Sequence, residues 1–426
     1  MPNVGAGKAE IDLEGVLPFD GFDEQLDAIW ARALVVEAGT RCCVVSVEAT
    51  SLRGDFVDLL RDAAATASSC PREATWICAT HTFSVPHVRT PDHLADDEER
   101  TRNERLREAL EGAVEKAARD AAESLRDATL SVACGVTGVN VNRDIDTPAG
   151  WWIGANPGGY SDHGIRALVA RGTDDGATMA VVFSADVQSS VLQGSRDGEG
   201  RRLVTGDLAG RATAHVESSS PGCVALFLEG AAADQAPAEQ AVVTTVARDG
   251  SISRSDGGDA GLALLDRLGT RLGEDVSSAL ADATPLDCRA VKATEVVVIC
   301  PGQRRADFAS LRPDRDYSYQ AAPDVTTTMC ALRLGDLVLL GVAPEIPSSL
   351  GTLVRTGCTT TLVDILTLVN GAEKYLPAHD AYERRTYEAM NSGFGEGSAE
   401  ALLRAAIETV NNALGSRGND ELGDRL

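Results

Sequence analysis

ATWICATHTFSVP, residues 74–86, joins an apolar run directly to a polar tip. Residues 76–79 include aromatic and β-branched side chains, which predicts a short buried strand. The tip, residues 80–84, contains His81, and Pro86 turns the chain away. In α/β proteins, side chains at the end of a buried strand face the crevice where ligands and metals bind. The stretch predicts either a site residue at His81 or a histidine whose ring bonds a neighbouring carbonyl group.

Outward from this stretch, apolar runs of strand length alternate with amphipathic runs of helix length. We expect strands at residues 4–13, 41–48, 130–142, 167–171, 180–186, 221–230 and 294–300, and a hairpin at 329–342. We expect helices at residues 51–67, 261–281, 348–355 and 398–414, and a solvated helix face within 91–125. Residues 24–37 predict a short helix or the start of a strand, and residues 151–159 and 250–259 predict loops. The pattern predicts an α/β fold with mixed β-sheets in the core and flanking helices.

Composition excludes several classes of partner. The formal net charge is −25 at pH 7, which argues against nucleic acid and anionic membranes, since both require a basic face. The ten cysteines form no metal-binding spacing, which favours reduced, buried thiols. The sequence has neither a signal-peptide pattern nor an 18-residue apolar stretch. We therefore expect a cytoplasmic protein without an integral membrane segment; the oligomeric state is left open.

Several segments together resemble the catalytic domain of the neutral (non-lysosomal) ceramidase family. THTFSVP resembles that family's THTHSGP segment, and GVNVNRDIDTPAGWWIGANPGG resembles its stretch with an Asn-Arg pair and an Asn-Pro loop. Further similar segments are AGKAEIDL, VVFSADVQSSVL, LVTGDLAG, LFLEGAAADQAP, LLGVAPEIPSSLG and NGAEKYLPAHDAYERRTYEA. The resemblance runs in order from about residue 5 to residue 396. It implies one catalytic domain over residues 1–426, without the immunoglobulin-like C-terminal domain of larger members.

The resemblance also implies a site. In the family, a zinc ion held by two His, a Glu and a Tyr activates the water that attacks the amide carbonyl of ceramide. Carried over, these ligands are His81, Glu345 and Tyr375, with Gln188 where the family has its second zinc His. The second His of THTHSGP, which the family uses near the reacting carbonyl, is Phe83 here. The implied substrate-binding residues are Phe83, Asn142, Arg143 and Asp207.

The two departures from the family pattern change the expected chemistry. Gln188 offers only a weak amide oxygen, so zinc affinity should fall. Asp186 lies two residues earlier on the expected strand, where period-two geometry would put it on the same face. A site of His81, Asp186, Glu345 and Tyr375 would be rich in oxygen and would suit manganese, iron or magnesium better than zinc. Alternatively, Asp186 and Glu345 pair with arginines such as Arg143.

Phe83 replaces a polar group with an apolar wall, a loss typically worth about 10²-fold or more in rate. Arg143 is suited to holding a carboxylate or phosphate. The sequence thus predicts a hydrolase of a linear amide bond in a small or lipidic N-acyl amine, with a metal-bound water as nucleophile. Two alternatives stay open. One is a metal-free enzyme using Asp186, Glu345 and His81 as acid and base, and the other is a non-catalytic homologue that binds a ligand in the former zinc pocket.

Overall fold

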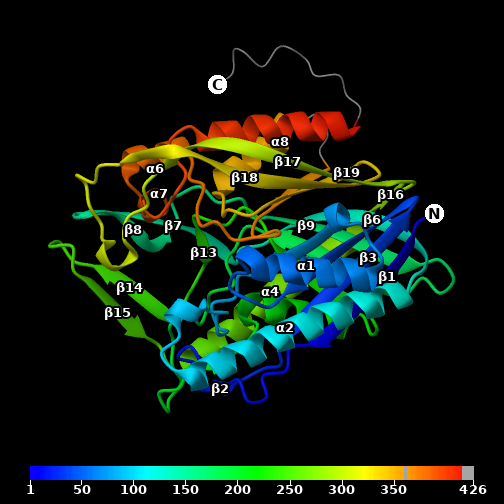
Figure 1. Ribbon diagram of the computed structural model, residues 1–426, viewed down its shortest axis with the longest axis horizontal. Helices are drawn as coiled ribbons and strands as arrows, with labels where there is room; N and C mark the ends of the chain where they lie inside the picture. Colours follow the sequence, from blue (N-terminus) through cyan, green and yellow to red (C-terminus); the bar gives the residue numbers. More distant parts are fainter. Residues whose placement is uncertain (359–361, 415–426) are drawn as a thin grey trace.

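The computed structural model describes residues 1–358 and 362–414 (Figure 1). The fold is α/β with mixed sheets and flanking helices, as predicted. A nine-stranded sheet has the order β12-β10-β9-β6-β1-β3-β4-β5, with β16 paired to β6. Its strands are β1 (Asn3–Glu10), β3 (Trp30–Ala38), β4 (Thr40–Val47), β5 (Thr75–Ala79), β6 (Arg126–Val136), β9 (Gly164–Gly172), β10 (Thr178–Ala185), β12 (Val224–Glu229) and β16 (Thr284–Leu286). Residues 30–38 form a strand. Of the short helix and the strand start expected for residues 24–37, the strand is therefore confirmed.

The large sheet consists of two halves joined by a short seam. Strands β1 and β6 pair only through Asn3 with Asp127 and Val4 with Arg126. The halves then fold toward each other, since Ser46 Oγ on β4 donates a hydrogen bond of 2.6 Å to the carbonyl oxygen of Phe227 on β12. The first half (β1, β3, β4, β5) and the second half (β6, β9, β10, β12, β16) thus enclose apolar side chains between them.

A four-stranded sheet closes the third side of this core. Its order is β17-β18-β19-β20, formed by β17 (Val291–Gln303), β18 (Ala321–Leu334), β19 (Leu337–Val342) and β20 (Val363–Leu366). Trp76, Leu226 and Leu332, one from each side, belong to one buried cluster. The expected hairpin at 329–342 is the β18–β19 pair, which turns at Gly335 with a φ of 63°.

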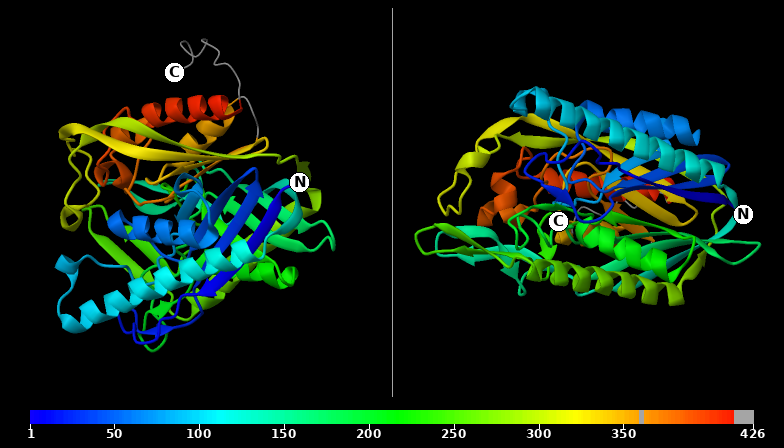
Figure 2. Two further views of the ribbon diagram at one scale, coloured as in Figure 1. Left: turned by 45° about the vertical axis from the view of Figure 1, so that its right-hand side comes forward. Right: turned by 90° about the horizontal axis from the view of Figure 1, so that it is seen from below.

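Helices cover the outer face of each sheet (Figures 1 and 2). α1 (Gly54–Ser68) and α2 (Asp97–Glu123) pack on the first half, and α3 (Asp207–Ser219) and α4 (Ala260–Ala279) pack on the second half. α5 (Ser348–Gly357) and α8 (Ser398–Leu414) cover the four-stranded sheet. Gly7 lets α2 approach β1, since a Cβ there would lie 2.5 Å from the carbonyl oxygen of Ala117. No helix of the described ranges is long and apolar enough to cross a membrane.

Smaller elements surround one end of the sheets. They are the three-stranded sheet of β7 (Asn140–Thr147), β8 (Gly150–Asn156) and β13 (Gln235–Pro237), the hairpin of β14 (Val242–Val246) and β15 (Ile252–Asp256), the pair β2 (Glu24–Gln25) and β11 (Leu203–Val204), and the short helices α6 (His379–Arg384) and α7 (Tyr387–Met390). The expected loops at 151–159 and 250–259 are therefore wrong in part, because β8 pairs with β7 and β15 with β14. The expected strand at 130–142 is likewise two strands, β6 and β7.

Three pairs of parallel strands end at the same place in the molecule. They are β4 with β5, β10 with β12, and β19 with β20. Backbone bonds connect the segments beyond these ends: Thr80 N donates to Val47 O over 3.0 Å, and Thr367 N donates to Glu229 O over 3.0 Å. Ligand sites in α/β proteins lie beyond the carboxyl ends of parallel strands, so this convergence positions the candidate site.

Candidate functional site

His81 follows β5 and is fixed by its backbone and by its ring. Its φ of 56° lies in the left-handed region, and its Nδ1 donates to the carbonyl oxygen of Thr50 over 2.6 Å. Because β4 and β5 are parallel neighbours, Thr50 beyond β4 lies beside the tip beyond β5. The bond to Thr50 fixes the ring so that Nε2 faces Glu345, 3.1 Å from Oε2. The ring thus bonds a carbonyl group, as the second sequence alternative expected, and also faces a buried acid; a role of His81 as a site residue stays a prediction.

Glu345 follows β19 and is fixed by the chain beside it. Its backbone N donates to Lys374 O over 2.7 Å, and Leu376 N donates to Glu345 O over 2.8 Å. This bridge places Tyr375 opposite Glu345. Glu345 is 4% and Tyr375 5% exposed. The acid and the phenol predicted from the sequence are therefore neighbours in a water-poor environment.

Gln188 joins Glu345 to Arg143. Its Nε2 donates to Glu345 Oε2 over 3.1 Å, and its Oε1 accepts from Arg143 Nη1 over 2.7 Å. Arg143 lies on β7 where the register with β8 shifts between residues 142 and 144, a bulge of the kind that re-aims a side chain. The guanidinium lies over the ring of Tyr375, with Cζ 5.5 Å from the centroid.

Glu388, from the short helix α7, neutralises Arg143. Its Oε1 accepts from Arg143 Nε over 2.8 Å and lies 2.6 Å from Nη2. Both side chains are buried, and a buried charge in a protein requires an opposite charge beside it. Tyr387 beside it stacks edge-on against Tyr375, with ring centroids 5.9 Å apart. The site therefore continues as a buried polar network from His81 to α7.

Burial and charge set the protonation of the central pair. Burial alone would lower the pKa of His81, but the carboxylates of Glu229 and Glu345 outweigh it and raise this pKa to about 9. Burial would raise the pKa of Glu345, but the charge and hydrogen bond of His81 outweigh it and lower this pKa below its usual value. At neutral pH the geometry therefore favours an imidazolium beside a carboxylate.

The donors around this pair do not fit a resident zinc ion. A zinc site uses about three or four ligands, typically His, Cys or carboxylate, and here only His81 and Glu345 are of these types, with the phenol of Tyr375 opposite Glu345. The ligating oxygen of Gln188 already accepts from Arg143, a permanent cation. Among the residues that the structure describes, no group of three or more His, Cys, Asp or Glu could hold a metal ion. Arg143 and the imidazolium of His81 are the positive charges beside Glu345.

Asp186, the expected replacement ligand, lies in different surroundings. Strand β10 ends at Ala185, and Val187 N donates back to Ala185 O over 2.9 Å. The expectation that Asp186 and Gln188 share a strand face is therefore wrong, because neither residue is in the strand. Asp186 Oδ1 accepts from Ala231 N over 2.9 Å and Oδ2 from Ser348 Oγ over 2.8 Å. Its carboxylate fixes the loop after β12 to the start of α5.

The other predicted residues line or support the site. Phe83 lies edge-on to His81, with ring centroids 4.6 Å apart. Asn142 Nδ2 donates to Asp234 Oδ2 over 3.0 Å, which secures the bulge next to Arg143. Asp207 accepts from the backbone N of Val191 and Leu192 over 2.8 and 3.0 Å, and from Ser84 Oγ over 2.9 Å. Asp207 thus ties the loop of Gln188 to the tip of His81.

Two acids in this network were not predicted. Glu229 ends β12, and burial raises its pKa to about 8 although the charge of His81 opposes the shift. Its Oε2 accepts from Thr367 Oγ1 over 2.9 Å, while its Oε1 has no hydrogen-bond partner among the described residues. An acid directly after the apolar run 224–228 was a usable signal. Glu388 gave no such signal, since it lies in a four-residue helix.

Comparison with solved structures supports the fold. No protein-family model matches the sequence, and no curated protein matches it. Among solved structures, the chain is similar to the neutral ceramidase from Pseudomonas aeruginosa, at a TM-score of 0.72 and 15% identity over 98% of this chain and 75% of that one. It is similar at the same TM-score and identity to a ceramidase complexed with C2, over 97% of this chain and 75% of that one. The chain therefore has a neutral ceramidase-like fold.

Proposed function

We propose that this protein hydrolyses the amide bond of a small or lipidic N-acyl amine at the site formed by His81 and Glu345, without a resident zinc ion. The contact of 3.1 Å between His81 Nε2 and Glu345 Oε2 carries the proposal. It pairs an acid with a base beyond the carboxyl ends of the strands, in a fold like that of neutral ceramidase. The fold likeness favours an amide substrate, and the donor set favours chemistry by side chains.

In the proposed reaction, each charged group at the site takes part in a defined step. The Glu345 carboxylate accepts a proton from the water whose oxygen bonds to the carbonyl carbon. Arg143 and the imidazolium of His81 donate hydrogen bonds to the oxygen that becomes negative. As the C–N bond breaks, His81 gives its proton to the departing amine. The products are a carboxylic acid and an amine, and the proton held by Glu345 returns to His81 across the same contact.

A second candidate is a ligand-binding protein without turnover. It is favoured by Gln188, which bonds both Glu345 and Arg143, and by the Phe83 ring against His81. Phe83 covers one side of the imidazole, and Gln188 takes up hydrogen-bonding positions of Glu345 and Arg143. In this case the buried charges would recognise a polar ligand without activating water.

A hydrolysis assay on chelator-treated protein distinguishes these functions. The substrates are N-acyl p-nitroanilides and N-acyl alkylamines of increasing chain length, with and without added Zn²⁺ or Mn²⁺. We expect turnover to survive EDTA and to fall by about 10²-fold or more in His81→Asn and Glu345→Gln. His379→Asn and Glu199→Gln, at exposed positions, are the matched controls.

Other outcomes overturn the proposal. Loss of turnover with EDTA and its recovery with Zn²⁺ would establish a metal enzyme. Saturable binding of the same compounds by calorimetry without turnover, abolished in His81→Asn, would establish the ligand-binding function.

A further inference from the structure

Three cationic side chains from separate segments lie beside the candidate site, those of Arg53, Arg305 and Lys374. The backbone N of Glu345 donates to Lys374 O over 2.7 Å. Arg53 follows, by three residues, Thr50, whose carbonyl oxygen bonds the imidazole of the site. The segment of Arg305 is joined by backbone hydrogen bonds of 3.0 and 3.1 Å to the end of α7 and the residues beyond it. Backbone bonds thus hold these three residues, here called the cation cluster, around the site.

The charges of the cation cluster act on one another and on Glu345. Burial lowers the pKa of Lys374, the charges of Arg53 and Arg305 lower it further, and the carboxylate of Glu345 opposes them. Partial burial also lowers the pKa of Arg53, with Glu345 opposing this shift and Arg305 adding to it. Lys374 is half-buried, and both arginines are more exposed. Like charges this close repel each other, so an anion bound among them would stabilise the cluster.

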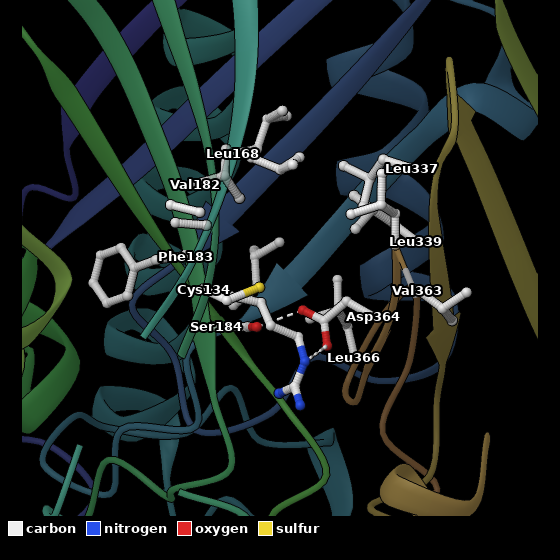
Figure 3. Close-up of a pocket in the computed structure, with 16 residues that line it drawn as sticks. Cys134, Leu168, Val182, Phe183, Ser184, Leu337, Leu339, Val363, Asp364 and Leu366 are labelled. Carbon is white, nitrogen blue, oxygen red and sulfur yellow. Dashed lines mark hydrogen bonds and ion pairs between the residues drawn. The ribbon is translucent and has the colours of Figure 1, made fainter. Parts of the chain in front are cut away.

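No side chain of the cation cluster makes an ion pair or a hydrogen bond within the part of the chain that the structure describes. Arg166 and Arg355, by contrast, share three carboxylates, those of Asp162, Asp186 and Asp364. Ser184 also donates a hydrogen bond to the last of these (Figure 3). The interior cations are therefore compensated by the protein itself, whereas the cation cluster is not.

The charges inside the candidate site already balance each other. Arg143 pairs with Glu388, and the imidazolium of His81 faces the carboxylate of Glu345. Glu229 is mostly protonated at neutral pH, because burial raises its pKa to about 8. The cation cluster is thus an excess of positive charge at the site, in a chain whose formal net charge is −25. Such a local reversal of sign attracts anions to the site.

We propose that the cation cluster binds an anionic group of the substrate, which is an N-acyl amine carrying a carboxylate or a phosphate. Guanidinium and ammonium groups form charge-assisted hydrogen bonds with both of these oxyanions. A neutral N-acyl amine would leave the cluster without a partner. The choice of an N-acyl amine rests on the proposed function, while the binding of an anion rests on the cluster alone.

Matched substrates test the charge preference. N-octanoylglycine, N-octanoylethanolamine and N-octanoylethylenediamine share an acyl chain and a scissile amide bond, and are anionic, neutral and cationic at neutral pH. We expect kcat/KM, measured as octanoate release by mass spectrometry, to fall in that order. N-octanoyl-O-phosphoethanolamine distinguishes a phosphate from a carboxylate. Raising the NaCl concentration from about 50 to about 500 mM should reduce the preference for the anion, because salt screens partly exposed charges.

Variants assign the preference to the cation cluster. Lys374→Gln should lower the ratio of kcat/KM between the glycine and ethanolamine conjugates by about tenfold. Arg53→Gln and Arg305→Gln should each lower it by about threefold, since these side chains are more exposed. Lys292→Gln and Arg404→Gln remove the same charge at exposed positions elsewhere, and should leave the ratio unchanged. The two arginine variants test the cluster even where Lys374→Gln does not fold.

Two results would overturn the anion site while leaving the hydrolysis in place. They are equal kcat/KM values for the glycine and ethanolamine conjugates, and a ratio that the cluster variants change no more than the controls do. Absence of turnover with every conjugate would instead contradict the proposed function. Calorimetry then decides on the cluster: tighter binding of N-octanoylglycine than of N-octanoylethanolamine, weakened in Arg53→Gln, would support the anion site, and equal binding would overturn it.

Discussion

Arg143 donates a hydrogen bond of 2.7 Å from Nη1 to Oε1 of Gln188, so a permanent cation holds the oxygen with which Gln188 could bind a metal. Replacing Gln188 by His would remove this oxygen and add an imidazole next to His81 and Glu345. We expect Gln188→His to bind zinc at least about 10- to 100-fold more tightly than the wild-type protein. Changing a residue that only hydrogen-bonds to a metal ligand already alters metal affinity by this factor, and this variant adds a ligand. Zinc bound after dialysis, measured by mass spectrometry, tests this.

The control for metal binding is Gln25→His, at an exposed position on β2. It adds an imidazole without adding a donor to the site and should leave zinc binding at the wild-type level. Stoichiometric, tightly bound zinc in the wild-type protein would contradict the view that Arg143 takes the place of the metal's charge.

We expect the effects of replacing His81 and Glu345 on the free energy of unfolding to depend strongly on each other. Both side chains are about 5% exposed, so removing one leaves the other buried without its partner. Glu345→Gln or His81→Gln should each lower the free energy of unfolding by about 3–5 kcal/mol. The double variant should lose less than the sum, by about 0.5–3 kcal/mol. Urea unfolding of the four proteins measures this cycle, and additive losses would show that the pair does not interact.

Asp207 is expected to act on the site by positioning two loops. It has a φ of 51°, and its carboxylate accepts from Val191 N, Leu192 N and Ser84 Oγ. Asp207→Ala would leave these donors unsatisfied, at about 1–3 kcal/mol for each buried group. Asp207→Asn keeps an acceptor oxygen and tolerates the backbone conformation, so it should lose less. Thermal unfolding of both variants tests this order, and equal losses would contradict it.

The fold was largely predictable from sequence because its main elements have strong periodicity. Residues 42–45 and 180–183 are apolar runs, and both lie in buried strands. The prediction failed where backbone pairing overrides composition. Residues 252–256 are exposed at every position, yet they form β15 because β14 lies beside them. No property of that segment alone predicts the pairing.

The sequence predicted which residues lie together at the candidate site better than it predicted the hydrogen bonds between them. Family resemblance brought His81, Gln188, Glu345 and Tyr375 into one prediction, and these residues lie together. Asp186 was misplaced because period-two alternation was extended past Ala185, where the strand ends. The bond between Arg143 and Gln188 depends on a bulge in β7, and a sequence pattern does not reveal the direction in which a bulge turns a side chain. Roles in catalysis stay a prediction for all of these residues.

Acid should weaken the attachment of the segment that follows the site tip. Asp20 Oδ2 accepts from His87 N over 2.8 Å and contacts His87 Nδ1 over 2.7 Å, and Oδ1 accepts from Arg89 Nε over 2.9 Å. Burial would raise the pKa of Asp20, but the hydrogen bonds from His87 and Arg89 outweigh it and lower this pKa from 3.8 to about 2. Residues 87–89 are thereby fixed to the loop before β2.

A carboxyl group whose pKa is lower in the folded than in the unfolded protein stabilises the fold. The full contribution is present at pH values where the group is ionised in both the folded and the unfolded protein. The contribution of Asp20 is therefore complete above about pH 4 and is lost as the pH falls to about 2. Because Asp20 is partly open to solvent, we expect its ionised carboxylate to contribute about 1–2 kcal/mol to the free energy of unfolding. Unfolding free energies of the wild-type protein and Asp20→Asn should differ by this amount at pH 6 and converge toward pH 2. Asp316→Asn, at an exposed position, is the control, and a difference that stays constant with pH would mean that Asp20 acts through packing rather than through its charge.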